Sequence, residues 1–288
     1  MSIVSLPFFI FLAITAAVYW LYPGRSRWVV LLAAGGFFIL FNTAWDPVRL
    51  AVFAGEALLT WLAALAVDRA GSERVKTAVT TAAVLGLIAA LIWYKDLSFF
   101  VDNLNRVFAL LGREARLAMP ETRAPFGVSY YTLTLVAYLL DVRWGTLERP
   151  ERNPLKMLLF AGYFPQLTSG PVTRYGEVAP ALLGGARWSL RGVQFGLQRL
   201  LWGLFKKLVL ADRLAVAVAA LYDGEPAVGL WVPLAAALYI AQLYADFSGC
   251  MDVALGAAEI FGAPLPENFR RPFAAANLSE LWRRWHIT

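Results

Sequence analysis

Long apolar runs separated by short charged loops dominate the pattern of the chain. An apolar run of about 20 residues is long enough to cross a bilayer as a helix. Such runs, some shorter than this, together with the broken stretch described below, predict about eight membrane-embedded segments. The runs are 3–22, 28–41, 48–67, 78–94, 126–140, 190–220, 228–244 and 253–261.

Two of the long stretches are interrupted in ways that change their interpretation. The stretch 158–172 is apolar but contains Pro165, Gly170 and Pro171, so it cannot cross the membrane as one helix. Irregular backbone at membrane depth is tolerated beside protein or a watery cavity, which favours a re-entrant segment over a surface loop. The run 190–220 is expected to form two segments that meet at an interface, because four charged residues interrupt it: Lys206, Lys207, Asp212 and Arg213.

The stretch 96–112 is too polar to span a membrane, yet its apolar residues recur at near-helical spacing. We expect an amphipathic helix lying at the membrane interface. The first run has no Lys or Arg before it, so it is interpreted as a retained helix rather than a secretory signal.

Composition agrees with a membrane protein. Of the 288 residues 59% are hydrophobic and 16% are charged, whereas soluble domains carry about 25% charged residues. The net charge of +6 is expected to set orientation and to meet anionic lipid headgroups, so no nucleic-acid partner is predicted. A single Cys and a single His make an intramolecular disulfide impossible and predict no metal site.

Basic residues are more frequent in the loops after the first and third apolar runs than in the loop after the second. The positive-inside rule then places those two loops in the cytoplasm and the N-terminus outside. The sequence predicts an all-α, multi-pass membrane protein.

Two acidic residues lie within or beside apolar runs, where a carboxylate costs several kcal/mol. Glu56 lies inside the third run, and an arginine of a neighbouring helix could pair with it. Asp246 ends the run 228–244. It is a candidate functional residue, although Asp and Ser before a helix are ordinary caps and Ser248 could cap a helix starting at Gly249.

The stretch 266–288, PENFRRPFAAANLSELWRRWHIT, holds the only histidine, His286. Asn277 and Glu280 have the spacing of a capping box. On the helix that it would open, Trp282 and His286 share a face, and Arg283 and Arg284 point elsewhere. One interpretation is an interfacial helix with Trp at headgroup depth and snorkelling Arg. The other is a catalytic histidine that acts as a general base.

Five stretches, in this order, resemble the membrane-bound O-acyltransferase (MBOAT) family. The likeness is to the branch with the membrane subunit of bacterial alginate O-acetylation and the D-alanyl transferase of teichoic acids. The resemblance covers 124–288, while 1–123 is similar only in being helical, and together they are expected to form one membrane domain. The stretches are APFGVSYYTLTLVAYLLDV, GYFPQLTSGPVTRY, GLFKKLVLADRLA, YADFSGCMDVALG and PENFRRPF with LSELWRRWHIT.

The resemblance implies a ring of tilted helices with re-entrant segments around a tunnel. His286 would be catalytic and would line that tunnel, and donors near it would stabilise an oxyanion. The expected substrate-binding residues are Trp282, Trp285, Arg283, Arg284, Asp246 and Asn268.

The resemblance also implies the reactants. An acetyl-CoA or acyl-carrier thioester would donate from the cytoplasm, with no permanently bound cofactor, and an extracytoplasmic polysaccharide would accept. A periplasmic or extracellular hydrolase-like protein would be the partner in a bacterial inner membrane. D-alanyl transfer from a carrier protein and a non-catalytic transporter or assembly subunit are the alternatives. Family members continue past the WRRWH motif to a second histidine, so a fragment of a longer protein is expected here, with a truncated form of doubtful activity as the alternative.

Overall fold

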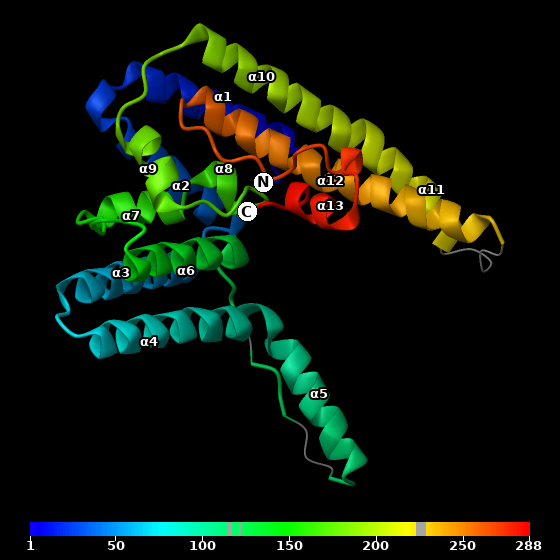
Figure 1. Cartoon of the computed structure of the whole chain (residues 1–288), viewed down its shortest axis with the longest axis horizontal. Coiled ribbons are helices and arrows are strands. Elements are labelled where there is room, and N and C mark those ends of the chain that lie inside the picture. Colours follow the sequence, from blue (N-terminus) through cyan, green and yellow to red (C-terminus); the bar gives the residue numbers. More distant parts are fainter. Residues whose placement is uncertain (114–116, 121, 223–228) are drawn as a thin grey trace. The chain divides into compact units, whose positions relative to one another are not determined.

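The computed structural model describes residues 1–113, 117–120, 122–222 and 229–288. Within these residues the regular structure is helical, which confirms the all-α prediction (Figure 1). The α-helices are α1 Leu6–Leu21, α2 Trp28–Asn42, α3 Pro47–Arg69, α4 Glu73–Leu91, α5 Leu97–Leu110, α6 Val128–Trp144, α7 Pro154–Ala161, α8 Phe164–Leu167, α9 Tyr175–Leu183, α10 Leu190–Leu204, α11 Asp212–Tyr222, α12 Trp231–Ile260 and α13 Leu278–Arg284.

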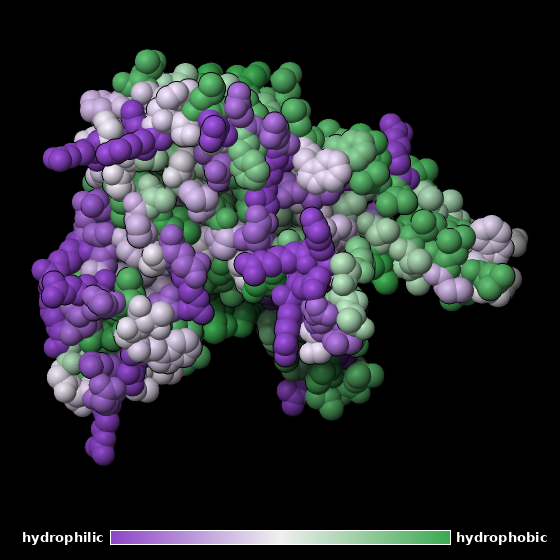
Figure 2. All heavy atoms as spheres, turned by 45° about the horizontal axis from the view of Figure 1, so that its top comes forward, coloured by the Kyte–Doolittle hydropathy of each residue, from purple (hydrophilic) through white to green (hydrophobic). Residues whose placement is uncertain are grey.

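Three helical stretches of the described residues are long and apolar enough to cross a membrane. They are Gly24–Asn42, Pro47–Arg69 and Glu73–Leu110, and the shorter Leu6–Leu21 is also apolar. Large hydrophobic side chains are exposed along them, such as Leu59 at 68%. Figure 2 shows further hydrophobic surface, in green, at α11 and the first turns of α12. The chain is a multi-pass membrane protein, and the number of about eight embedded segments stays a prediction.

The chain divides into two compact units. One comprises residues 32–164 and 174–176, and the other comprises 1–31, 165–173 and 177–288. In the first unit α3, α4 and α6 pack together (Figure 1). Arg143 of α6 pairs with Glu73 of α4 at 3.0 Å. Glu56 of α3 lies beside Tyr131 and forms no ion pair with an arginine of the described residues, so the suggested Glu56–Arg pair was wrong.

The broken stretch 158–172 has the interrupted backbone that its prolines and glycine predict. Helix α7 ends at Ala161, and α8 is a single turn. Helix α5 confirms a helix over most of 96–112, joined to α4 through a π-helical turn at Ile92–Asp96. The re-entrant path of the first and the interfacial position of the second stay predictions.

In the second unit α10 and α12 run side by side (Figure 1). Gly203 of α10 meets Gly249 of α12 so closely that a Cβ on Gly203 would lie 2.7 Å from the Gly249 carbonyl oxygen. Gly196 and Gly256 make a second such contact. Small residues allow this approach, as is common between membrane helices.

Two sequence-based boundaries in this unit were wrong. The runs 228–244 and 253–261 were expected to be separate, but residues 231–260 form one helix, α12, so Ser248 does not cap a new one. The Ser248 hydroxyl instead accepts a hydrogen bond of 3.0 Å from Lys206. The run 190–220 is likewise unbroken, because a π-helical segment, Phe205–Ala211, joins α10 to α11.

Ion pairs between these helices explain why neither helix breaks. Lys206, only 8% exposed, pairs with Asp252. Lys207 pairs with Asp246 at 2.7 Å and with Asp212 at 3.1 Å. A charged side chain that pairs with an opposite charge on the neighbouring helix does not need water for solvation, so the helix can continue through it.

Candidate functional site

The stretch after α12 folds back so that two of its own parts lie alongside each other. Gly262, at φ +68°, turns the chain at the end of α12. An antiparallel bridge then joins Phe269 to Trp285. The Arg270 N–H donates to the Arg284 carbonyl at 2.9 Å, and the Ile287 N–H donates to the Asn268 carbonyl at 3.0 Å. Residues 268–270 therefore hold residues 284–287.

Helix α13 begins as the sequence predicts. The Asn277 side chain accepts a hydrogen bond of 2.8 Å from the Glu280 N–H. The Glu280 carboxylate accepts from the Ala276 N–H at 2.8 Å, one residue before the usual partner in a capping box, and pairs with Arg284. The Ala276 N–H and the Arg284 guanidinium lower the pKa of the Glu280 carboxyl.

His286 does not lie on α13, contrary to the sequence-based interpretation. The helix ends at Arg284, and Trp285 is extended at φ −106°. His286 adopts the left-handed region at φ +49°. The cause is the pairing with 268–270, which draws residues 285–287 out of the helix. Trp282 and His286 therefore do not share a helix face.

Aromatic side chains of α12 and of the folded-back stretch surround this turn. The His286 ring lies 5.0 Å from the Phe247 ring. Trp285 lies 5.3 Å from Phe269 and 5.8 Å from Tyr244. Phe247 therefore covers one side of the imidazole, and the other two rings pack against its neighbour Trp285. Trp282, at 63% exposed, projects outward.

Asn268 is the buried centre of the turn, at 1% exposed. Its side-chain oxygen accepts from the Thr288 N–H and from the Thr288 hydroxyl, each at 3.2 Å. Its amide nitrogen lies 3.5 Å from the Met251 sulfur of α12. The amide of Asn268 thus ties the His286 turn to α12.

A bidentate ion pair fixes the residue before Asn268. The Arg199 guanidinium of α10 donates two hydrogen bonds of 2.6 Å to the Glu267 carboxylate. Its Nε donates to Asp252 of α12 at 3.0 Å. We call Arg199, Asp252, Glu267 and Asn268 the anchor. The first three were not predicted as site residues, and no local signal could have found them because Arg199 lies 53 and 68 residues from its partners.

The other residues expected at the site lie in different settings. Asp246, on α12, pairs with Lys207. Arg284 pairs with Glu280, four residues earlier on α13. Arg283 forms no ion pair within the described part of the chain. The structure therefore brings together His286, Trp285 and Asn268 from the expected set, and their roles in substrate binding stay predictions.

One ring nitrogen of His286 forms a hydrogen bond within the turn, and a role of the imidazole as a catalytic base stays a prediction. Nδ1 lies 3.2 Å from the Thr288 carbonyl oxygen. With its proton on Nδ1, the ring donates to that oxygen and leaves the Nε2 lone pair available. Among the described residues no carboxylate pairs with His286, and no group of His, Cys, Asp and Glu could hold a metal ion.

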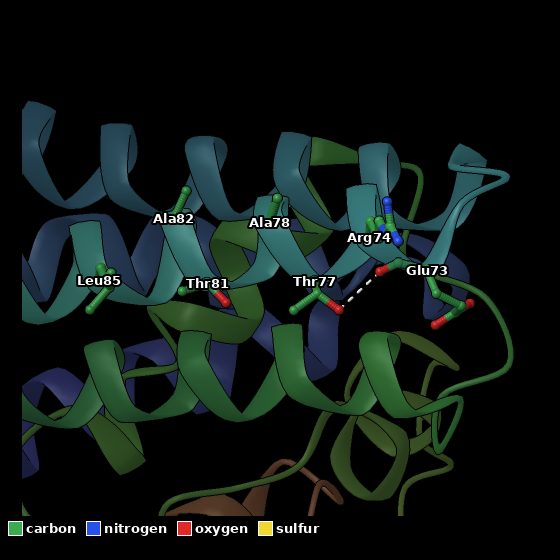
Figure 3. A pocket seen from close by; sticks show the side chains of 7 residues that line it. All are labelled: Glu73, Arg74, Thr77, Ala78, Thr81, Ala82 and Leu85. Atoms are coloured by element: carbon green, nitrogen blue, oxygen red, sulfur yellow. Dashed lines mark hydrogen bonds between the residues drawn. The ribbon is translucent and has the colours of Figure 1, made fainter.

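A separate groove of about 670 Å³ follows α4 in the first unit (Figure 3). Thr77 lines it and donates from its hydroxyl to the Glu73 carbonyl at 2.9 Å. The remaining lining combines the charged side chains of Glu73 and Arg74 with Thr81 and the small or aliphatic side chains of Ala78, Ala82 and Leu85. The residues expected at the acyl-transfer site are not among them.

A family model matches the part of the chain that contains α12, the stretch after it and the turn at His286. The model of the membrane-bound O-acyltransferase family, MBOAT, matches residues 145–288. The chain belongs to this family. The match includes α7 to α13 and therefore the whole anchor and His286.

Individual relatives extend the similarity to almost the whole chain. The protein named "Probable alginate O-acetylase AlgI" of Pseudomonas putida is 34% identical over 97% of this chain and 57% of its own length. The peptidoglycan O-acetyltransferase of Helicobacter pylori is 29% identical over 91% of this chain and 53% of its own. The teichoic acid D-alanyltransferase of Bacillus subtilis is 27% identical over 56% of this chain and 42% of its own. The chain spans about half the length of the first two.

Proposed function

We propose that this chain is part of a membrane O-acetyltransferase that modifies a polysaccharide outside the bacterial plasma membrane. Membership of the MBOAT family supports acyl transfer. The two kinds of relative that match almost the whole chain are named as an alginate O-acetylase and a peptidoglycan O-acetyltransferase. These names favour acetyl as the transferred group and a polysaccharide as the acceptor. The observation that carries the proposal is His286, held in a turn with Nε2 available.

The proposed reaction moves an acetyl group from a thioester to a hydroxyl. His286 Nε2 takes the proton of the attacking hydroxyl, whose oxygen forms a bond to the thioester carbonyl carbon. The carbonyl oxygen becomes an oxyanion, and the candidate donors close to His286 in sequence are Arg283, Arg284 and the indole N–H groups of Trp282 and Trp285. The carbon–sulfur bond then breaks, and the imidazolium returns its proton to the leaving thiolate.

In this proposal acetyl-CoA binds from the cytoplasm and the acetyl group passes through a tunnel between the helices. The bilayer core excludes the charged donor, so only the acyl end reaches the acceptor. The N-terminus lies outside, as the distribution of basic residues predicts. A hydrolase-like partner outside the membrane receives the acetyl group or passes it to the polysaccharide.

The test is transfer of radiolabelled acetyl from acetyl-CoA to the polysaccharide fraction, in native membranes that contain the protein and its partners. The informative variant is His286→Asn, because Asn tolerates the left-handed backbone that His286 adopts and so preserves the turn. Loss of the base should lower the rate by about 10²–10⁴-fold. The control is Ser279→Ala, an exposed position on α13 outside the site.

Retention of the wild-type rate by His286→Asn would refute base catalysis and favour a transporter or assembly subunit. A second candidate function is D-alanyl transfer, which the similarity to the teichoic acid D-alanyltransferase favours. The same membranes distinguish it: label would pass from a D-alanyl carrier protein and not from acetyl-CoA, and His286→Asn would abolish that transfer.

A further inference from the structure

A pocket of about 530 Å³ lies at the end of α3, outside the site described above. It is lined by Trp61, Leu65, Asp68 and Arg69 of α3, and by Arg152 of the loop before α7. The four α3 residues follow the spacing i, i+4, i+7 and i+8, so they form one stripe along one face of the helix. The stripe changes from aromatic and aliphatic to charged within two turns, at the end of a candidate membrane span.

The walls of the pocket are fixed by hydrogen bonds that leave its charges free. The Trp61 indole N–H donates to the Glu151 carbonyl at 2.8 Å. The Glu151 N–H donates to the Tyr138 hydroxyl of α6 at 3.0 Å. Asn153 caps α7 by accepting from the Leu155 N–H at 2.9 Å. Arg152 therefore projects from a backbone that is held on both sides.

Neither Arg69 nor Arg152 forms an ion pair with any residue that the structure describes. Asp68 is also without an ion-pair partner in that part of the chain. Two guanidinium groups and one carboxylate give the pocket a net charge of +1. A guanidinium binds a phosphate in bidentate fashion, and the carboxylate can accept from a hydroxyl.

We propose that this pocket binds a phospholipid, with the headgroup phosphate between Arg69 and Arg152 and an acyl chain along Trp61 and Leu65. A headgroup with a single negative charge and hydroxyl donors, as in phosphatidylglycerol, matches the charge and the carboxylate of Asp68. Basic pockets at the ends of membrane helices bind anionic headgroups in this manner. Leu62, 52% exposed, and Leu59 precede Leu65 on the same helix and add exposed aliphatic surface that an acyl chain can contact.

Native mass spectrometry of the detergent-purified full chain, titrated with phosphatidylglycerol, measures the binding. Phosphatidylcholine with the same acyl chains is the comparison lipid. Each of Arg69→Gln and Arg152→Gln should weaken binding of phosphatidylglycerol about fivefold, and the double variant about 25-fold. The matched control is Arg149→Gln, an exposed arginine three residues before Arg152 that does not line the pocket. It should leave the binding unchanged.

Three results would overturn the proposal. The double variant could bind as well as the wild type, or Arg149→Gln could weaken binding as much as Arg152→Gln, which would indicate a diffuse effect of surface charge. Soluble glycerophosphoglycerol, which has the headgroup without chains, could displace the lipid at a similar concentration. The pocket would then take a free phosphate ester rather than a lipid. None of these outcomes depends on acyl transfer.

Discussion

The pair between Arg199 and Glu267 offers the sharpest test of how the His286 turn is held. In Glu267→Gln, one of the two hydrogen bonds from Arg199 is retained and the charge is lost. Hydrogen bonds to charged groups contribute about 1.5–3 kcal/mol each. Because the Glu267 side chain is 42% exposed, water replaces part of this interaction, and Arg199 keeps Asp252. We expect a loss of about 1–2 kcal/mol in the free energy of unfolding.

Unfolding by denaturant in mixed micelles measures this loss, with Glu259→Gln as the control. Glu259 is an acidic residue near the end of α12 without an ion pair among the described residues, so its substitution should change the free energy of unfolding by less than about 0.5 kcal/mol. Equal stability of Glu267→Gln and Glu259→Gln would show that the ion pair with Arg199 does not stabilise the fold.

The same variant separates anchoring from general stability through its kinetics. Glu267 is a positioning residue, because it contacts Arg199 and not the reacting groups. If the anchor sets the position of His286, Glu267→Gln lowers kcat of acetyl transfer and leaves KM for acetyl-CoA nearly unchanged. Equal kcat in Glu267→Gln and the wild type, measured well below the unfolding transition, would show that the turn keeps its geometry without the ion pair.

The remaining predictions concern local structure. Gly203→Ala should lower the free energy of unfolding by about 1–3 kcal/mol, because the added Cβ would meet the Gly249 backbone between α10 and α12. The control is Gly55→Ala, which has open space around it and should be neutral or slightly stabilising. Unfolding by denaturant measures both variants. Asn277→Ala should cost about 1 kcal/mol by the same assay, through loss of the α13 cap. The pKa of the Glu280 carboxyl is lower in the folded state than in the unfolded state. The ionised carboxylate therefore stabilises the fold fully above the unfolded-state pKa, and this stabilisation is lost as pH falls through the folded-state pKa. Glu280→Gln should therefore make stability less sensitive to acidification from about pH 6 to about pH 3, and an unchanged pH profile would contradict this.

The sequence predicts those features whose causes are local. Helices α1 to α4 follow from apolar runs that need no partner to be recognised. The cap of α13 follows from Asn277 and Glu280, whose hydrogen bonds span three or four residues. His286 was also found as a candidate from the sequence, because it is the only histidine and lies in a motif that resembles one family.

The errors in the helix boundaries share one physical cause, which is pairing between residues distant in sequence. Asp246 indicated a break in α12 because a carboxylate in an apolar segment is costly when alone, and Asp252 lies in the same helix. Their partners, Lys207 and Lys206, lie on the neighbouring helical segment, and no spacing rule links them. The end of α13 was misplaced for the same reason, since Phe269 draws Trp285 out of the helical backbone.

These long-range pairs have a consequence for how the candidate site is organised. His286 itself contacts one aromatic ring of α12 and the Thr288 carbonyl, and these two contacts alone leave a short exposed turn free to move. The buried Asn268 restricts the turn. The residue before it, Glu267, pairs with Arg199 of α10, and Arg199 also pairs with Asp252 of α12. Because glycine contacts hold α10 and α12 together, the anchor transmits the geometry of a rigid helix pair to a single imidazole. A base on a loop can meet the positional demands of catalysis when such a scaffold supports it.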